Sequence, residues 1–179
     1  MRKAICILSA LGVLFFLSGV ALAQPEGAPK PGPEHKKLQR FVGKWSGTGE
    51  LKPGPFGPGG PVTWKEKCDW FPGGFSLLCH SEGTGPMGDV KGLSVLSYDA
   101  MKGAYTYFGV DSTGWSSFSH GKVEGKTWTY SSEMTMGEMK FKARFILEEI
   151  SDTEHEFKFE MSEDGSTWNT VMEGSSTKG

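Results

Sequence analysis

The sequence has 179 residues and a formal net charge of −2. Its 19 basic and 21 acidic residues are nearly balanced, which excludes a strongly basic protein. We therefore expect neither nucleic acid nor an anionic membrane surface as a partner. The length fits one domain with a hydrophobic core of its own.

Residues 1–23 have the three parts of a secretory signal peptide. Arg2 and Lys3 form the basic start, residues 4–20 are largely apolar, and Ala21-Leu22-Ala23 is a small-x-small cleavage site. We predict a mature chain that begins at Gln24 and is secreted or periplasmic. A retained anchor is the alternative, but the apolar stretch is shorter than the roughly 20 residues of a spanning helix. We therefore expect no stable membrane insertion after cleavage.

The remaining chain divides into a leader, a short helix and a series of strands. Residues 24–33 are rich in Pro and Gly, which predicts a disordered leader, and residues 34–42 allow a short helix. The domain that follows is predicted to span 34–179. Short alternating or aromatic-rich segments separated by Gly, Pro and Asp-Gly predict strands over 44–52, 62–71, 75–83, 90–98, 104–111, 114–123, 126–135, 138–149, 154–162 and 167–176.

Two cysteines remain after cleavage of the signal peptide, Cys68 and Cys79. In an exported protein, two cysteines suggest one disulfide, whereas two reduced buried thiols are the alternative. A hairpin with the four-residue loop 72–75 places them directly opposite each other, at a separation of about 4.5–5.5 Å between Cα atoms. This separation suits a disulfide, so we predict the bond Cys68–Cys79.

Two other hairpins have predicted registers. A turn centred on Asp164-Gly165 pairs Met161 with Trp168, Phe159 with Thr170 and Phe157 with Met172. A turn centred on Glu124-Gly125 pairs Gly121 with Trp128 and Ser119 with Tyr130. In both hairpins the apolar residues of the two strands then share one face.

The segment 138–149 has the clearest alternation of apolar and basic residues. Met139, Phe141, Ala143 and Phe145 share one face, and the intervening positions are basic. One dry and one wet face are typical of a barrel wall. We predict an all-β fold, a single antiparallel up-and-down barrel of about ten strands with a short N-terminal helix, because closure removes exposed strand edges.

Several segments resemble known families. Gly43-Lys44-Trp45 resembles the Gly-x-Trp start of lipocalins and the wider calycins, where the Trp closes one barrel end. Residues 41–47 and 105–111, together with Tyr98-Asp99, Gly125 and Asp164-Gly165, resemble the bacterial family called domain of unknown function fifteen seventy-nine. This resemblance implies a lipocalin-like barrel and no established activity. Lipocalins place an arginine of the last strand over the Trp, and here that strand offers Lys178.

No catalytic, metal or cofactor motif is evident in the sequence. The four histidines, His35, His80, His120 and His155, have neither His-x-His nor His-x₃-His spacing. His155 continues the apolar face of the following strand, where haem ligation is the functional alternative to an ordinary strand-end histidine. We predict no metal site, no cofactor and no catalytic residue.

The aromatic content is the feature that most suggests a function. We predict that the barrel binds a small apolar ligand, with orientation set by the polar groups of Tyr130 and His155. The alternatives are a structural or protein-interaction barrel with a filled core, and an enzyme that acts at the barrel mouth. The ligand-binding residues predicted from the shared inward face are Phe141, Phe145, Phe157, Phe159, Met161, Trp168, Tyr130 and His155.

Overall fold

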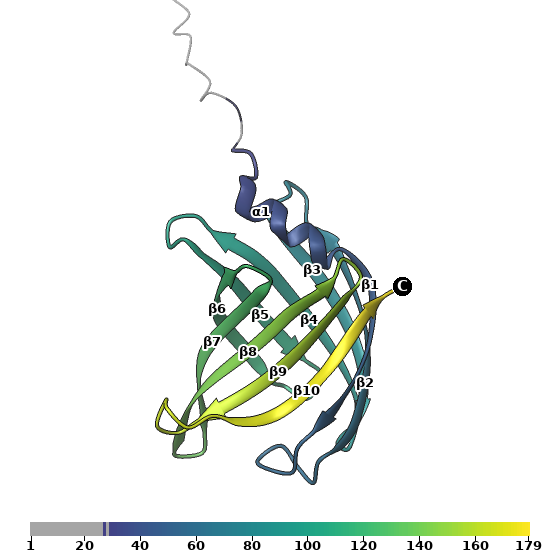
Figure 1. Ribbon diagram of the computed structural model, residues 1–179, viewed down its shortest axis with the longest axis vertical. Coiled ribbons are helices and arrows are strands. Elements are labelled where there is room, and N and C mark those ends of the chain that lie inside the picture. Colours follow the sequence, from purple (N-terminus) through teal and green to yellow (C-terminus); the bar gives the residue numbers. More distant parts are fainter. Residues whose placement is uncertain (1–26, 28) are drawn as a thin grey trace, which may run out of the picture.

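The computed structural model describes residue 27 and residues 29–179, which form a closed barrel of ten antiparallel strands (Figure 1). Each strand pairs with its neighbours in sequence, and β1 closes the ring by pairing with both β2 and β10. The predicted up-and-down barrel is confirmed. The predicted signal peptide and the cleavage site before Gln24 lie outside the described residues.

The strands begin and end close to the predicted positions. They are β1 (Gly43–Leu51), β2 (Gly60–Trp70), β3 (Ser76–Gly85), β4 (Gly88–Asp99), β5 (Ala104–Asp111), β6 (Ser116–Glu124), β7 (Thr127–Met136), β8 (Met139–Ser151), β9 (Glu154–Ser162) and β10 (Asn169–Lys178).

A short helical segment lies across one end of the barrel (Figure 1). It consists of α1 (Pro33–Lys37) and a 3₁₀ turn, η1 (Leu38–Phe41). Pro33 opens the helix, where its missing N–H removes no helical hydrogen bond. Leu38 and Phe41 are buried against the strands. We call this end of the barrel the capped end and the opposite end, which carries the loops 52–59 and 163–168, the far end.

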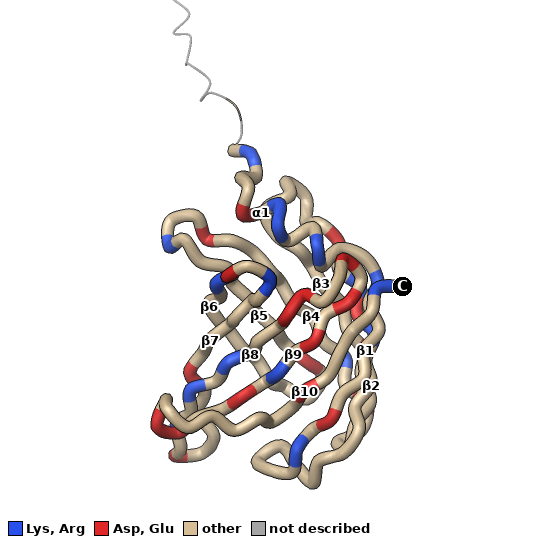
Figure 2. Tube along the Cα trace, in the orientation of Figure 1, with Lys and Arg blue, Asp and Glu red and all other residues tan. Residues whose placement is uncertain are grey.

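Alternation along the strands separates a dry interior from a wet exterior. In β8, Phe141 and Ala143 are buried whereas Lys140 and Lys142 are exposed, as predicted, but Met139 at the start of the strand is 57 % exposed. Figure 2 shows acidic and basic residues interspersed over the strands, so both signs of charge occur on the barrel wall. The period of two residues per repeat therefore assigns most side chains to the correct face.

The hairpin of β2 and β3 has the predicted register. Cys68 pairs with Cys79 and the two form a disulfide, while the backbone N–H of Phe71 donates to the Ser76 carbonyl at 2.9 Å. This bond closes the four-residue loop 72–75, as expected from the inability of Pro72 to donate one. The predicted disulfide is confirmed.

The register predicted for the hairpin of β6 and β7 is wrong by one turn position. Gly121 pairs with Tyr130, and Glu124 pairs with Thr127 across the turn Gly125-Lys126. Gly125 has a φ of 61° at the first turn position, where a type II′ turn favours glycine. Every residue opposes a partner two places further along, so each side chain keeps its predicted face.

The register predicted around Asp164-Gly165 is also wrong. Met161 pairs with Asn169, Phe159 with Met172 and Phe157 with Gly174, with a bulge between Thr170 and Met172. Asp164 organises a wider loop in place of a two-residue turn, because its carboxylate accepts hydrogen bonds from the backbone N–H groups of Ser166 and Thr167, both at 2.7 Å. These hydrogen bonds hold the pKa of Asp164 well below its usual range, and the one from Thr167 has the largest effect.

The interior contains two hydrophobic clusters that follow the barrel axis. Met172 packs against both, so the clusters are continuous. The capped-end cluster has as its buried members Leu38, Phe41, Cys68, Leu77, Cys79, Leu96, Tyr105, Trp128, Tyr130, Leu147 and Phe157. The far-end cluster has as its buried members Leu51, Phe141, Ala143, Met161 and Val171.

Candidate functional site

The capped end is closed by aromatic packing and one cation. The Trp45 indole N–H donates to the Phe41 carbonyl at 3.0 Å, which ties η1 to β1. Phe41 packs edge-on against Trp128, with ring centroids 4.9 Å apart. The Lys178 ammonium lies 5.4 Å from the centre of the Trp45 ring. Lys178 therefore occupies the position over the Trp that the lipocalin resemblance assigns to an arginine.

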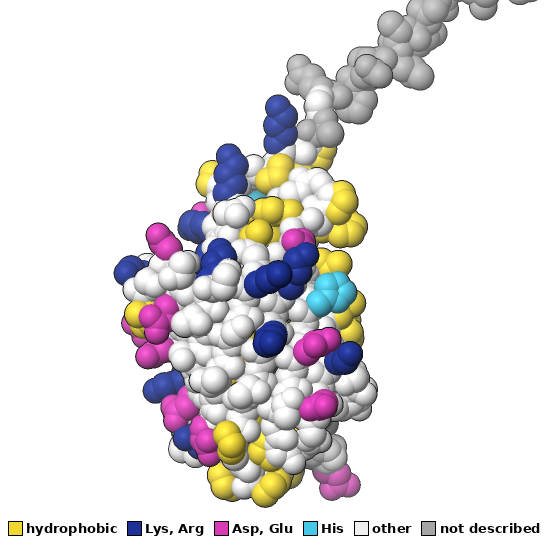
Figure 3. Space-filling view, turned by 90° about the vertical axis from the view of Figure 1, so that its right-hand side faces the viewer, with side chains coloured by type: hydrophobic (Ala, Val, Ile, Leu, Met, Phe, Trp, Pro, Cys, Tyr) yellow, Lys and Arg dark blue, Asp and Glu magenta, His cyan; other side chains and the backbone are white. Residues whose placement is uncertain are grey.

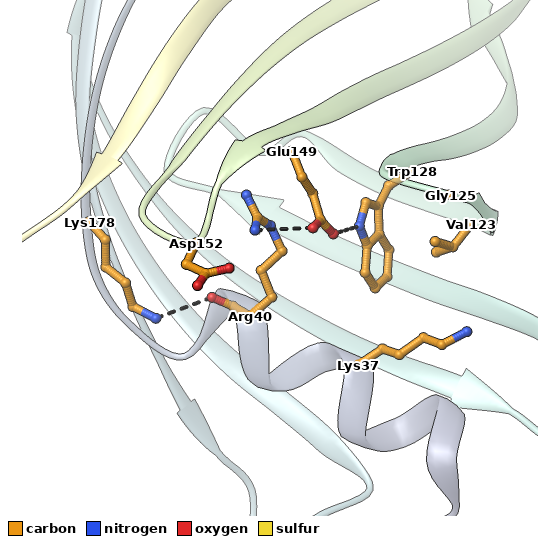
Figure 4. Close-up of a pocket in the computed structure, with 8 residues that line it drawn as sticks. All are labelled: Lys37, Arg40, Val123, Gly125, Trp128, Glu149, Asp152 and Lys178. Atoms are coloured by element: carbon orange, nitrogen blue, oxygen red, sulfur yellow. Dashed lines mark hydrogen bonds and ion pairs between the residues drawn. The ribbon is translucent and has the colours of Figure 1, made fainter.

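A pocket of about 680 Å³ opens beside this cap (Figure 4). Four of the residues that line it are joined by polar interactions, namely Arg40, Trp128, Glu149 and Lys178. Glu149 accepts the Trp128 indole N–H at 2.6 Å and pairs with the Arg40 guanidinium at 3.2 Å, and the Lys178 ammonium donates to the Arg40 carbonyl at 3.3 Å. Arg40 also donates to the Glu154 carbonyl at 2.9 Å. These interactions hold the helical segment on the barrel, so we assign this pocket a structural role.

His155 belongs to the same cap. It is buried, with its ring centroid 4.7 Å from that of Trp45. Burial, and secondarily the charge of Arg40, lower the pKa of His155 to about 4. The side chain is therefore neutral near pH 7 and packs among aromatic residues.

The middle of the barrel is lined by aromatic rings that lie over glycines. A Cβ atom added at Gly121 would lie 2.6 Å from the Tyr130 ring, and one at Gly109 would lie 2.7 Å from the Tyr107 hydroxyl. Trp64 covers Gly47 in the same way. Glycine at these positions allows the rings to lie close to the barrel wall. Phe145 and Phe157 stack beside them at 5.1 Å.

Glu66 is the one carboxylate that β2 directs into the interior. It lies on the same face of β2 as Trp64 and the buried Cys68, and its cross-strand neighbours are Trp45 and Ser81. Within residues 29–179, no hydrogen bond or ion pair reaches this carboxylate. Burial alone raises the pKa of Glu66 to about 7. The side chain is nevertheless partly exposed.

Two tyrosines extend this polar region. The Tyr107 hydroxyl lies against Gly109, whose cross-strand neighbour Ser94 pairs in turn with Cys79, and the Cys79 sulfur lies within 4.8 Å of the Glu66 carboxylate. Burial raises the pKa of Tyr107, and the charge of Glu66 raises it further. The Tyr107 and Tyr130 ring centroids are 6.3 Å apart. Tyr130 is 7 % exposed, and its hydroxyl has no hydrogen-bond partner within residues 29–179. We call Glu66, Tyr107 and Tyr130 the Glu66 cluster.

The sulfur atoms of the disulfide lie within 4.8 Å of the Glu66 carboxylate. Zinc binds cysteine as the thiolate, and here the two sulfur atoms are bonded to each other. This group of three side chains therefore does not provide a thiolate metal site.

The far end of the barrel is apolar. Partly buried hydrophobic residues surround the far-end cluster, and Figure 3 shows hydrophobic side chains at this end as well as at the capped end. Phe56, from the loop 52–59, approaches Trp115 and Phe159 with ring centroids 6.0 and 6.3 Å away. The partly buried residues are Phe56, Val62, Met134, Met136, Phe159 and Met172.

The predicted ligand-binding residues occupy four different places in the structure. Phe141, Phe159 and Met161 belong to the far-end cluster. Tyr130, Phe145 and Phe157 line the middle of the barrel, and His155 lies in the cap.

Trp168 lies outside the barrel, contrary to the predicted inward position. The Arg144 guanidinium lies 4.0 Å from the centre of the Trp168 ring, and Arg144 also pairs with Glu160 at 2.6 Å on the outer wall. The bulge in β10 and the wide Asp164 loop shift this residue off the inward face.

Glu66, Trp64 and Tyr107 were not predicted as site residues. A signal for Glu66 exists in the sequence, because it shares the parity of Trp64, Cys68 and Trp70 on one strand. A single acid between inward aromatic and cysteine residues, flanked by Lys65 and Lys67, indicates an interior carboxylate.

Comparison with known proteins identifies the family. A family model described as protein of unknown function (DUF1579) matches residues 30–178. The chain belongs to the DUF1579 family. No curated protein matches the sequence of this DUF1579 protein.

Two solved structures resemble this DUF1579 barrel. The crystal structure of Rv2717c from M. tuberculosis superposes with a TM-score of 0.60 at 12 % identity, covering 83 % of this chain and 98 % of that one. It shows the shared fold. The structure of EF1p2_mFAP2b bound to DFHBI is less similar to this chain, with a TM-score of 0.43 at 11 % identity, covering 81 % of this chain and 98 % of that one. Among the described residues, no helix has the length and apolar character to cross a bilayer.

Proposed function

We propose that this DUF1579 protein is exported and binds a small, largely apolar ligand inside its barrel, through the far end. The observation that carries the proposal is the contrast between the two ends. At the capped end Leu38 and Trp45 are at most 3 % exposed, whereas Phe159 and Met172 at the far end remain partly exposed. Apolar side chains that stay accessible inside a closed wall favour an apolar occupant.

Export is supported by the sequence pattern of residues 1–23 and by the disulfide. A cystine persists in oxidising compartments and is rare in the cytosol. The bond Cys68–Cys79 is thus compatible with a secreted or periplasmic protein.

The alternative function is structural, and a specific observation favours it. Trp64, Phe145 and Phe157 pack against one another at 5.1–5.2 Å between centroids and fill part of the middle of the barrel. A barrel whose core is complete in this way has no room for a ligand and would act through its outer surface.

Two phenylalanine variants separate the alternatives. Phe157 is buried in the core, so Phe157→Ala should lower the free energy of unfolding by about 3–5 kcal/mol. Phe159 is partly exposed at the far end, so we expect Phe159→Ala to lower it by less than about 2 kcal/mol and to weaken binding of decanol, a neutral apolar probe. Denaturant unfolding and calorimetric titration measure the two effects.

Equal destabilisation by the two variants, together with no binding of decanol to the wild type, would replace the ligand-binding proposal by the structural one. Native mass spectrometry of protein purified from its own source gives the complementary test. A mass above that of the polypeptide would identify the bound molecule.

A further inference from the structure

The Glu66 cluster lies in the middle of the barrel, and it differs in chemistry from the far end. An ionised carboxylate only accepts hydrogen bonds, whereas a phenol both donates and accepts. Glu66 contributes a carboxylate to the interior, and Tyr107 and Tyr130, whose ring centroids are 6.3 Å apart, contribute two phenol hydroxyls. No basic side chain within residues 29–179 pairs with Glu66, and its direct cross-strand neighbours are an indole and a hydroxyl.

Two independent observations indicate that this region is built for an occupant. The first is the inward carboxylate, which has no partner and yet keeps partial exposure. The second is the Tyr130 hydroxyl, which is buried and unpartnered, although buried polar groups are normally hydrogen-bonded. Leaving such groups unpaired destabilises the folded state, and a bound group that donates hydrogen bonds would relieve this.

The apolar surface continues from this cluster to the far end. Met172 packs against both hydrophobic clusters and is the direct cross-strand neighbour of Phe159, so the apolar surface is continuous from the capped-end cluster to Phe159. A molecule that lies along the axis would contact acceptors with one end and apolar side chains with the rest. This arrangement selects an amphipathic ligand with a single polar head.

We propose that the barrel binds a primary alkylammonium group on an apolar chain, with the ammonium at Glu66, Tyr107 and Tyr130 and the chain directed toward Phe159. An ammonium carries three donors and no acceptor, so it matches a site made of acceptors. A carboxylate head would meet the like charge of Glu66 and is excluded by the same geometry. This inference rests on the proposed ligand-binding function and names its ligand class.

Calorimetric titrations with three probes of equal chain length test the inference. We choose decylamine, decanol and decanoate at pH 8, where the amine is protonated. We expect decylamine to bind at least tenfold more tightly than decanol, and decanoate at least tenfold more weakly than decanol.

Three variants assign the head-group preference to the Glu66 cluster. Glu66→Gln should weaken decylamine binding at least tenfold and leave decanol binding unchanged. Tyr130→Phe should weaken decylamine binding severalfold without lowering the melting temperature, because the hydroxyl it removes has no partner in the protein. Glu148→Gln, which removes an exposed carboxylate of β8, is the matched control and should change neither.

The outcomes distinguish this inference from the proposed function. If decanol and decanoate bind as tightly as decylamine, or if Glu66→Gln leaves the preference unchanged, the alkylammonium inference is wrong and the apolar-ligand function stands. If none of the three probes binds, both are wrong. Retained affinity in Tyr130→Phe would remove Tyr130 from the site, and with it the second observation.

Discussion

Replacement of Glu66 by glutamine should stabilise the protein at high pH. Glutamine keeps the shape of the side chain but removes the titrating charge. The pKa of Glu66 is about 7 in the folded protein, against a usual value of 4.5. As the pH rises from 4.5 to 7, the unfolded chain releases this proton before the folded protein does, so the wild type loses stability with rising pH. The glutamine variant has no such loss.

The magnitude follows from the two pKa values. Between pH 5 and pH 8, the stability advantage of Glu66→Gln over wild type should grow by about 2 kcal/mol. His155 has a folded pKa of about 4, so its burial lowers stability as the pH falls from 6.5 toward 4. This contribution is the same in both proteins and cancels in their difference.

Urea unfolding at pH 5 and pH 8 measures the effect. Glu148→Gln, on the exposed side of β8, is the control and should show nearly the same difference from wild type at both pH values. An advantage of Glu66→Gln that does not change between pH 5 and pH 8 would show that Glu66 is solvated or paired, and the reasoning about the Glu66 cluster would fail.

Three further predictions concern the rest of the molecule. The double variant Cys68→Ala and Cys79→Ala should lower the free energy of unfolding by about 3 kcal/mol, because the disulfide closes a short loop with a sequence separation of 11. Two reactive thiols in the unreduced wild-type protein would contradict the disulfide. Gly121→Ala should cost about 1–3 kcal/mol in thermal unfolding, since its Cβ would lie 2.6 Å from the Tyr130 ring, and an unchanged melting temperature would refute that packing. Intact-mass analysis of exported protein should show a chain that begins at Gln24, whereas retention of residues 1–23 would exclude cleavage there.

The presence of an unpaired carboxylate at position 66 inside an apolar barrel needs a physical explanation. An inward carboxylate without a protein partner is destabilising when it is ionised, so an apolar residue at position 66, between Trp64 and Cys68 on the same face, would give a more stable fold. Binding sites are the usual places where such local conflicts persist.

The sequence by itself determined the barrel, most strand limits and the disulfide. These features depend on local patterns. Alternation with a period of two assigns faces, Gly and Pro mark turns, and Pro72 selects the four-residue loop that places Cys68 opposite Cys79. A register error of two residues, as at Gly121, leaves each side chain on its predicted face, so the assignment of inward and outward residues remains correct.

Only the tertiary structure decided which inward residues meet. The Asp164 loop and the bulge in β10 depend on hydrogen bonds that the alternation pattern does not contain, and they place Trp168 outside on Arg144. The level of a residue along the axis depends on the stagger of all ten strands on closure. For that reason His155 lies in the cap, Phe159 lies at the far end, and Tyr107 of β5 approaches Tyr130 of β7 in the middle.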